Sequence, residues 1–299
     1  MPQIRMVVTG TQGQLVRSLL EQGPTEGTDV IAVGRPILDL TKPNTIEGPI
    51  ATARPQVLVS AAAHTDTELA EIEPDVAESI NVRGAAAVAR CAARLDIPII
   101  HLSTAYVFDG RKATPYRESD PVAPLNAYGR TKWRGEVAVA IAQPRHVILR
   151  TSMIYAPFGR NFLTAMLRRA ADGAKVAVVD DQLVNPTATH DLAAGILTVA
   201  RNLVRGAGGP RAFGVFHMAG AKTATPAEFA AAIFAAAEAR GGPSARVVPI
   251  SSAQYQTRVK RPPNSVLDCT KVADIHGVAL PPWQPSLQAC MDRLTGAVR

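Results

Sequence analysis

Short apolar runs recur along the first half of the chain and are separated by longer stretches of helical periodicity. The runs lie at residues 4–8, 30–33, 57–60, 97–102 and 146–150. Each run is apolar almost throughout instead of alternating with polar residues, which is typical of strands covered on both faces of a parallel sheet. The pattern therefore predicts an α/β protein built on a doubly wound parallel sheet.

Helical periodicity marks three of the connecting segments in this half. These segments are about 14–22, 75–95 and 128–142. Beyond Arg150 the rhythm is less regular, and short apolar runs alternate with helices and proline-rich connections. We therefore expect a first domain over residues 1–150 and a smaller lobe over residues 151–299, with part of the second half returning to the first sheet.

Amino-acid composition limits the partners and the compartment that we expect for this protein. Of 299 residues, 47% are hydrophobic and 5% aromatic, and 32 Lys and Arg against 25 Asp and Glu leave a net charge of +7. The basic residues are scattered and few aromatic residues accompany them, so we expect no nucleic-acid partner. No segment reaches the roughly 18 uninterrupted apolar residues of a membrane span, so we expect no membrane association and a soluble, cytoplasmic protein.

Cysteine usage points to the same compartment. Cys91, Cys269 and Cys290 are three in number and widely spaced, with no CxxC pair. This spacing argues against a disulfide framework and against a structural zinc site. We therefore expect a reducing environment and no bound metal.

A glycine-bearing turn, TGTQG at residues 9–13, follows the first predicted strand. Glycines between a strand and a helix let the backbone approach a pyrophosphate, whose negative charge the helix N-terminus stabilises. A Gly-x-x-Gly pair alone marks many ordinary turns, but its position directly after the first strand favours a dinucleotide site. Val16 stands where a third glycine is usual, so we expect the first helix to pack slightly differently here.

The second predicted strand ends in Gly34-Arg35. At that position an acidic residue binds the ribose hydroxyls of NAD, whereas an arginine can neutralise the 2′-phosphate of NADP. We therefore expect NADPH as the cofactor, with NADH as the alternative. Arg35 can also be a solvated loop residue, with Asp39 and Leu40 contacting the adenine side.

The strongest candidate for chemistry is the set formed by Thr104, Tyr128 and Lys132. Residues four apart on a helix share a face, so Tyr128 and Lys132 can point into one cleft. A tyrosine with an ordinary pKa of about 10 is a poor acid–base catalyst at neutral pH, and a nearby ammonium and a nicotinamide cation are both expected to lower that pKa. The Thr104 hydroxyl, at a strand end, can then hydrogen-bond a substrate carbonyl oxygen.

The order of these motifs resembles the extended short-chain dehydrogenase/reductases and, more narrowly, the dTDP-4-dehydrorhamnose reductase family. The resemblance covers nearly the whole chain. Further stretches that carry it are AAAHT at 61–65, Asn81, ST at 103–104, YVFDG at 106–110, PYRE at 115–118, PLNAYG at 124–129, LRTS at 149–152, NF at 161–162, VDDQ at 179–182, PT at 186–187, RPPNSVL at 261–267 and LPPW at 280–283.

The resemblance implies a Rossmann-type fold and a role for each matching residue. Tyr128 is then the proton donor, Lys132 holds the nicotinamide ribose and the tyrosine, and Thr104 contacts the sugar. The residues that line the cofactor are Gly10, Gly13, Gln14, Leu15, Ala62, Ala63, His64, Thr65 and Leu102. On the substrate side we place Arg261, facing the diphosphate, together with Asn264.

Two further side chains keep alternative interpretations at this stage. Asn81 resembles the helix asparagine that anchors a water near the lysine, but it can equally be hydrogen-bonded inside a kinked helix. His64 and His101 have no metal-ligand neighbours in the sequence, so we interpret each of them as a histidine with its hydrogen bonds satisfied beside a strand.

The chain also departs from the family pattern at positions expected to face the sugar. Ala105 stands where the family usually has aspartate, and Met153 stands where a tryptophan usually packs on the sugar. Losing a carboxylate and a ring is expected to change which hydroxyls are recognised while leaving hydride chemistry intact. Some members bridge subunits through carboxylates and magnesium, and Arg17 stands where one such carboxylate is expected, so we predict a monomer or homodimer without metal.

These features favour an NADPH-dependent reductase of a nucleotide-activated 4-keto-6-deoxyhexose. The resemblance implies dTDP-4-dehydro-L-rhamnose as the substrate. Two alternatives remain: a ketoreductase for a different nucleotide-linked keto sugar, suggested by Ala105 and Met153, and a non-catalytic regulatory subunit of the same fold. Retention of Tyr128 and Lys132 argues against the regulatory subunit.

Overall fold

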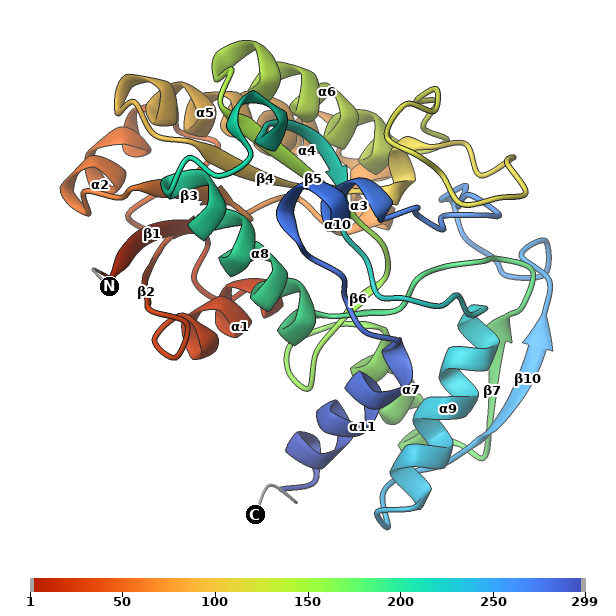
Figure 1. The fold of residues 1–299 in the computed structure, drawn as a ribbon. Helices are drawn as coiled ribbons and strands as arrows, with labels where there is room; N and C mark the ends of the chain where they lie inside the picture. The colour runs from red at the N-terminus through yellow and green to blue at the C-terminus, as the bar shows by residue number, and fades with distance from the viewer. Residues whose placement is uncertain (1–2, 297–299) are drawn as a thin grey trace.

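A six-stranded parallel sheet forms the centre of the molecule (Figure 1), and the computed structural model describes residues 3–296. Its order is β2-β1-β3-β4-β5-β9, and every neighbouring pair is parallel. The strands are β1 (Ile4–Thr9), β2 (Thr28–Val33), β3 (Val57–Ser60), β4 (Ile99–Thr104), β5 (His146–Thr151) and β9 (Gly214–His217). The predicted doubly wound α/β fold is confirmed.

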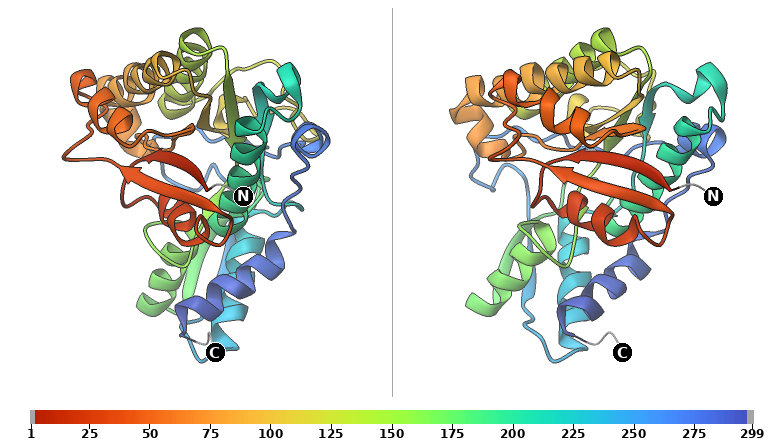
Figure 2. Two further views of the ribbon diagram at one scale, coloured as in Figure 1. Left: turned by 60° about the vertical axis from the view of Figure 1, so that its left-hand side comes forward. Right: turned by 90° about the vertical axis from the view of Figure 1, so that its left-hand side faces the viewer.

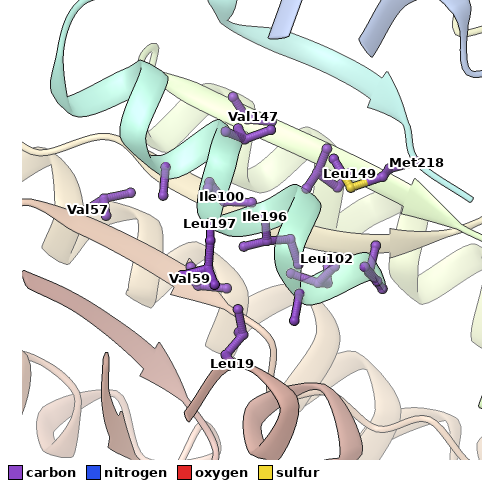
Figure 3. Close-up of a cluster of buried hydrophobic side chains, with 14 of the residues drawn as sticks. Leu19, Val57, Val59, Ile100, Leu102, Val147, Leu149, Ile196, Leu197 and Met218 are labelled. Carbon is purple, nitrogen blue, oxygen red and sulfur yellow. The ribbon is translucent and has the colours of Figure 1, made fainter. Parts of the chain in front are cut away.

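Helices cover both faces of this sheet (Figure 2). On one face lie α1 (Gln14–Gln22) and α8 (Thr189–Val204), and on the other lie α2 (Glu47–Thr52), α5 (Ala85–Arg94) and α6 (Ala127–Ala142). Figure 3 shows Ile196 and Leu197 of α8 among the inward side chains of Val59, Ile100 and Leu149. Each such fully buried aliphatic side chain contributes about 1.5–3 kcal/mol to folding.

The segment between β3 and β4 differs from its prediction. The pattern predicted one helix over 75–95, but the structure has α3 (Thr67–Ile72), α4 (Pro74–Glu78), a turn of π-helix η2 (Ser79–Gly84) and then α5. The predicted strand over 97–102 begins at Ile99 and ends at Thr104. Pro98, which has no N–H to donate to a sheet, immediately precedes it. This shift makes Thr104 the last residue of β4.

A second lobe has its own apolar core around Tyr155, Phe229 and Trp283. Its elements are α7 (Phe162–Asp172), β7 (Lys175–Val179), α9 (Pro226–Glu238), β10 (Arg246–Ile250) and α11 (Trp283–Leu294). The short strands β6 (Ile154–Tyr155) and β8 (Thr187–Ala188) pair beside it, while α10 (Thr270–His276) packs near β9. Within residues 3–296, no helix is both long enough and apolar enough to cross a membrane.

The sheet reverses its direction of growth between β1 and β3. From β1 the chain moves outward to β2, and then it crosses back to β3 on the other side of β1. The connections that follow β1 and β3 therefore run in opposite directions, and in α/β proteins a ligand-binding crevice is expected at the carboxyl ends of such strands. Gly10 and Ala62, one from each of these connections, lie next to each other there, since an added Gly10 Cβ would be 3.6 Å from the Ala62 Cβ.

Candidate active site

The turn after β1 is shaped for close approach by a ligand. Gly10 has φ +100°, and a Cβ added to the facing Gly34 would lie 3.1 Å from the Gly10 Cα, so both positions need glycine. Helix α1 begins directly after Gly13, which provides no side-chain cap. The first N–H groups of α1 therefore remain available to an anion. Val16 packs against this turn, 3.5 Å from an added Gly10 Cβ.

Two buried polar atoms next to this turn have no partner among the described residues. They are Gln14 Oε1 and His64 Nδ1. The interpretation of His64 as a histidine with its hydrogen bonds satisfied is therefore wrong for this nitrogen, because no described polar group reaches it. The loop that carries His64 is tied to β1, because the Thr9 hydroxyl accepts hydrogen bonds from the backbone N–H groups of Ala61 and Ala62, both at 3.0 Å. Unpaired buried polar atoms are unfavourable, so this crevice suits a ligand rich in hydrogen-bonding groups, such as a dinucleotide.

The residues predicted around the adenosine lie at the end of β2. Arg35 is exposed, and Asp39 accepts hydrogen bonds from the backbone and hydroxyl of Thr41 at 2.9 and 2.8 Å. These bonds hold the pKa of Asp39 below its ordinary value. Leu40 is buried against Gly84. Arg35 therefore presents a cation at the surface, while Leu40 acts in the core.

Three of the predicted catalytic residues come together at the carboxyl end of β4. Asn126 caps α6 by accepting a hydrogen bond from Gly129 N at 2.7 Å, which places Tyr128 in the first turn of the helix. The Thr104 hydroxyl lies close enough to the Tyr128 hydroxyl to lower its pKa. Tyr106 packs edge-on to Tyr128, with ring centroids 6.1 Å apart. Tyr106 is a neighbour that the sequence analysis did not assign to the site.

Lys132 lies one turn further along α6 and is 3% exposed. Its Nζ donates to the Leu102 carbonyl at 2.5 Å and contacts His101 Nε2 at 3.4 Å. The His101 Nδ1 in turn lies 3.1 Å from the Ser60 hydroxyl, so this histidine has partners on both nitrogens. Burial lowers the pKa of Lys132 to about 8, while the charge of Glu136 acts in the opposite direction.

The electrostatics of Tyr128 correct one expectation. The sequence analysis predicted a lowered pKa, but burial raises the pKa of Tyr128 to about 12, and the neighbouring Thr104 hydroxyl only partly opposes this. Lys132 has no such influence here because its ammonium group is directed at β4. Tyr128 is therefore protonated throughout the neutral range and is suited to donate a proton.

Asn81 occupies the π-helical turn η2. Its side chain accepts from His64 N at 2.8 Å and donates to the His64 carbonyl and to the Thr131 hydroxyl, both at 3.1 Å. These contacts correspond to the second of its two interpretations, a residue bonded within a distorted helix. They fix the loop that follows β3 against α6.

The residues expected on the substrate side are in different environments. Met153 is partly exposed, with φ +32°, and Arg261 pairs with Glu68 at 3.2 Å. Ala105 is fully buried in a small apolar cluster with Phe108, so its contact with a sugar stays a prediction without an exposed atom to support it. Asn264 binds three backbone groups of the fold, which favours a structural role over its predicted substrate contact.

The sequence analysis also missed a cluster of buried polar side chains next to the candidate catalytic residues, formed by Ser103, Glu136 and Arg150. One signal was available, because Glu136 follows Lys132 by four residues and so shares its helix face. In the described part of the chain, no three His, Cys, Asp or Glu side chains gather into a metal-binding group.

Together, the reversed parallel sheet, the glycine turn and the Thr–Tyr–Lys set define a protein of the extended short-chain dehydrogenase/reductase class. Comparison with known proteins then identifies the particular family. The family described as "RmlD substrate binding domain" matches residues 4–295, and the chain belongs to it.

Relatives and solved structures agree with this assignment. The chain is 41% identical over 283 residues, 95% of each protein, to a dTDP-4-dehydrorhamnose reductase of Sinorhizobium fredii. It is 34% identical to a "Probable dTDP-4,6-dihydroxy-2-methyloxan-3-one 4-ketoreductase" of Streptomyces antibioticus, covering 98% of this chain and 97% of that protein. The crystal structure of dTDP-4-dehydrorhamnose reductase from Bacillus anthracis in complex with NADP matches with a TM-score of 0.89 and 28% identity over 97% of this chain and 99% of that one.

Proposed function

We propose that the protein reduces the C4 keto group of dTDP-4-dehydro-L-rhamnose with NADPH and so produces dTDP-L-rhamnose. The observation that carries this proposal is the proximity of the Thr104 and Tyr128 hydroxyls, with Lys132 one helical turn away on α6. The names of the relatives support the substrate, and the NADP in the Bacillus anthracis structure supports the cofactor. A cytoplasmic location follows as part of the same proposal, because both substrates are water-soluble nucleotides.

The crevice at the reversal of the sheet fits NADPH by its chemistry. The N-terminus of α1 beside Gly10 and Gly13 offers N–H groups to a pyrophosphate, and exposed Arg35 offers a cation to the 2′-phosphate. Gln14 and His64 each hold a buried polar atom that a bound nucleotide can satisfy. When bound, NADPH supplies the hydride.

The residues of this chain then stabilise the substrate carbonyl oxygen and supply the proton that it takes up. Thr104 hydrogen-bonds the substrate carbonyl oxygen and stabilises the negative charge that develops on it. Tyr128 donates its phenolic proton to this oxygen, since a pKa of about 12 keeps that proton on the free enzyme at neutral pH. Lys132 is tied to β4 and holds α6 in the register that brings Tyr128 to Thr104. Arg261, at the border of the two lobes, binds the diphosphate.

The proposal is tested with purified protein, NADPH and dTDP-4-dehydro-L-rhamnose, following the loss of NADPH absorbance. We expect turnover by the natural chain and a loss of about 10²–10⁴-fold in kcat for Tyr128→Phe. Tyr155→Phe is the matched control, because it removes a tyrosine hydroxyl in the second lobe, 3.0 Å from the Trp283 carbonyl. It should keep kcat and lower stability by about 1 kcal/mol.

Two outcomes contradict the proposal. A folded protein that binds NADPH but reduces no keto sugar favours the non-catalytic regulatory subunit. Full activity in Tyr128→Phe removes the proton donor from the mechanism. The oligomeric state, a monomer or a homodimer, is a separate prediction that light scattering after size-exclusion chromatography decides.

A second candidate keeps the chemistry and changes the sugar. It is favoured by Met153, which lacks the ring usual at this position, and by the similarity to the Streptomyces antibioticus 4-ketoreductase. A panel of nucleotide-linked keto sugars, ranked by kcat/KM, separates the two candidates. A clear preference for dTDP-4-dehydro-L-rhamnose rejects the second, and a preference for another sugar rejects the first.

A further inference from the structure

A buried ion pair lies one helical turn beyond Lys132. Glu136 of α6 and Arg150 of β5 are 3% and 4% exposed. Arg150 donates to both carboxylate oxygens, from Nε at 3.0 Å and from Nη2 at 2.7 Å. This two-point contact fixes the orientation of the carboxylate as well as its position.

The same carboxylate also binds the end of β4. The Ser103 hydroxyl donates to Glu136 Oε1. Ser103 lies between Leu102, whose carbonyl accepts a hydrogen bond from Lys132, and the catalytic Thr104. Two side-chain bonds, one from Lys132 and one to Glu136, therefore join β4 to α6 directly behind the contact between Thr104 and Tyr128.

We propose that Glu136 is a positioning residue for the catalytic group. It holds the end of β4 against α6, so that the Thr104 hydroxyl stays within hydrogen-bonding reach of Tyr128, and it directs a negative charge toward the Lys132 ammonium. Glu136 itself touches neither substrate nor cofactor. This inference rests on the proposed function for its kinetic consequences, but its structural and electrostatic consequences are independent of it.

Stability alone does not account for this arrangement. A buried ion pair can often be replaced by apolar residues of similar size without loss of stability, because both charges must leave water. Arg150 stacks over the Phe108 ring at 5.1 Å, and its Nη1 is buried without a partner. One hydrogen-bond donor of the pair therefore has no partner, which agrees with a role in positioning the neighbouring elements.

The electrostatic environment of Lys132 is simple enough to test. The titratable groups that face it are Glu136 on its own helix and His101 on β4. The pKa of His101 lies well below its ordinary value because of burial, so its ring is neutral. Glu136 is then the charge that opposes loss of the Lys132 proton, and removing it should lower the pKa of Lys132 below about 8.

The test compares four variants for kcat, for the pH dependence of kcat and for unfolding. They are Glu136→Gln, Ser103→Ala, the double variant Glu136→Met with Arg150→Met, and Asp292→Asn. The last is the matched control, because it breaks the Arg240–Asp292 ion pair of the second lobe, 2.6 Å long. It should leave kcat and its pH profile unchanged.

We expect Glu136→Gln to lose about 10–100-fold in kcat, as a small misplacement of catalytic groups produces. The alkaline limb of its pH profile should move to lower pH by roughly one unit. Ser103→Ala should lose less and keep the profile. If Glu136→Gln fails to fold, the double variant decides, since it leaves no unpaired buried charge. Natural kcat and an unshifted profile in the folded double variant overturn the proposal.

A measurement without substrate separates this inference from the proposed function. Nitrogen-15 NMR of the lysine side chains titrates Lys132 directly in the natural chain, in Glu136→Gln and in the double variant. A lower pKa in both variants supports the proposal even if the natural chain reduces no keto sugar. An unchanged pKa in both overturns it, whatever the activity.

Discussion

Lys132 keeps a cationic group in surroundings that disfavour the charge. Its Nζ is buried beside a strand and has a carbonyl and a neutral histidine as partners. Burial accordingly lowers the pKa of this amine to about 8 from an ordinary value of 10.5. This lowering of the pKa corresponds to a destabilisation of the folded state by roughly 3 kcal/mol while the amine is charged. The buried ammonium of Lys132 therefore lowers the stability of the fold, which agrees with the catalytic role that we propose for it.

Lys132→Met should therefore abolish reduction and yet stabilise the fold. We expect the free energy of unfolding at pH 7 to rise by about 1–3 kcal/mol, since the lost hydrogen bonds offset part of the gain. The cost of the charge is complete below pH 8 and disappears as the pH rises from about 8 to 10.5, so the advantage of the variant should disappear over the same range.

Urea denaturation at pH 7 and pH 10 measures this difference. Lys271→Met is the matched control, because Lys271 also donates to a strand carbonyl, that of Val215 at 2.7 Å, but is only partly buried. A Lys132→Met protein that is less stable than the natural chain at pH 7 contradicts the prediction.

At the scale of elements, the π-helical turn η2 and helix α6 pack in close contact at one small residue, Gly135. Gly135 of α6 faces the carbonyl oxygen of Asn81, and an added Cβ would overlap that oxygen. The close approach brings the Asn81 side chain to Thr131 and to the loop of His64. The irregular turn and the glycine together hold the loop of His64 against helix α6, which carries the proposed catalytic residues.

Gly135→Ala should force these two elements apart. We expect it to lower the free energy of unfolding by about 1–3 kcal/mol, the usual cost of overpacking a tight contact. It should also raise the KM for NADPH, because Asn81 holds the loop of His64. Gly48→Ala is the control: Gly48 lies in helix α2 with no atom within 4 Å of an added Cβ, and the change should be neutral or slightly stabilising. Equal stability of the two variants contradicts the prediction.

At the scale of the whole molecule, one contact joins the two lobes over the site. Glu68 of α3 accepts hydrogen bonds from the Thr257 hydroxyl and from Arg261, the latter at 3.2 Å. These bonds hold the pKa of Glu68 below its ordinary value. Arg261 is also hydrogen-bonded to Tyr106, next to Tyr128. Glu68 therefore forms an ion pair with Arg261, the cation that we propose binds the substrate diphosphate.

Glu68→Gln should release Arg261 and strengthen substrate binding. The pair is partly exposed, and such pairs contribute about 0.2–1 kcal/mol, so the KM for the nucleotide sugar should fall by up to about five-fold with little change in kcat. Glu73→Gln makes the same charge change at an exposed position nearby and should have no effect. An unchanged or higher KM in Glu68→Gln contradicts the role assigned to Arg261.

Local patterns in the sequence were sufficient for much of the fold and for part of the site. Apolar runs predicted five strands of the sheet, since burial on both faces leaves a continuous signature. The glycine turn after β1 and the four-residue spacing of Tyr128 and Lys132 were readable because they depend on neighbours in the chain. The prediction of one continuous helix over 75–95 was wrong in its middle, where residues 79–84 form a π-helical turn. Such a turn depends on the elements that pack against it.

The sequence by itself determined the class of fold and the family, and it supplied the pair Tyr128 and Lys132 that we propose as catalytic. Only the tertiary structure decided their electrostatics: burial raises the pKa of Tyr128, although the sequence predicted a lower one. It also decided which distant side chains meet, such as Ser103 with Glu136 and Glu68 with Arg261. Desolvation and long-range contacts depend on how the elements pack, and no short window of the sequence contains that information.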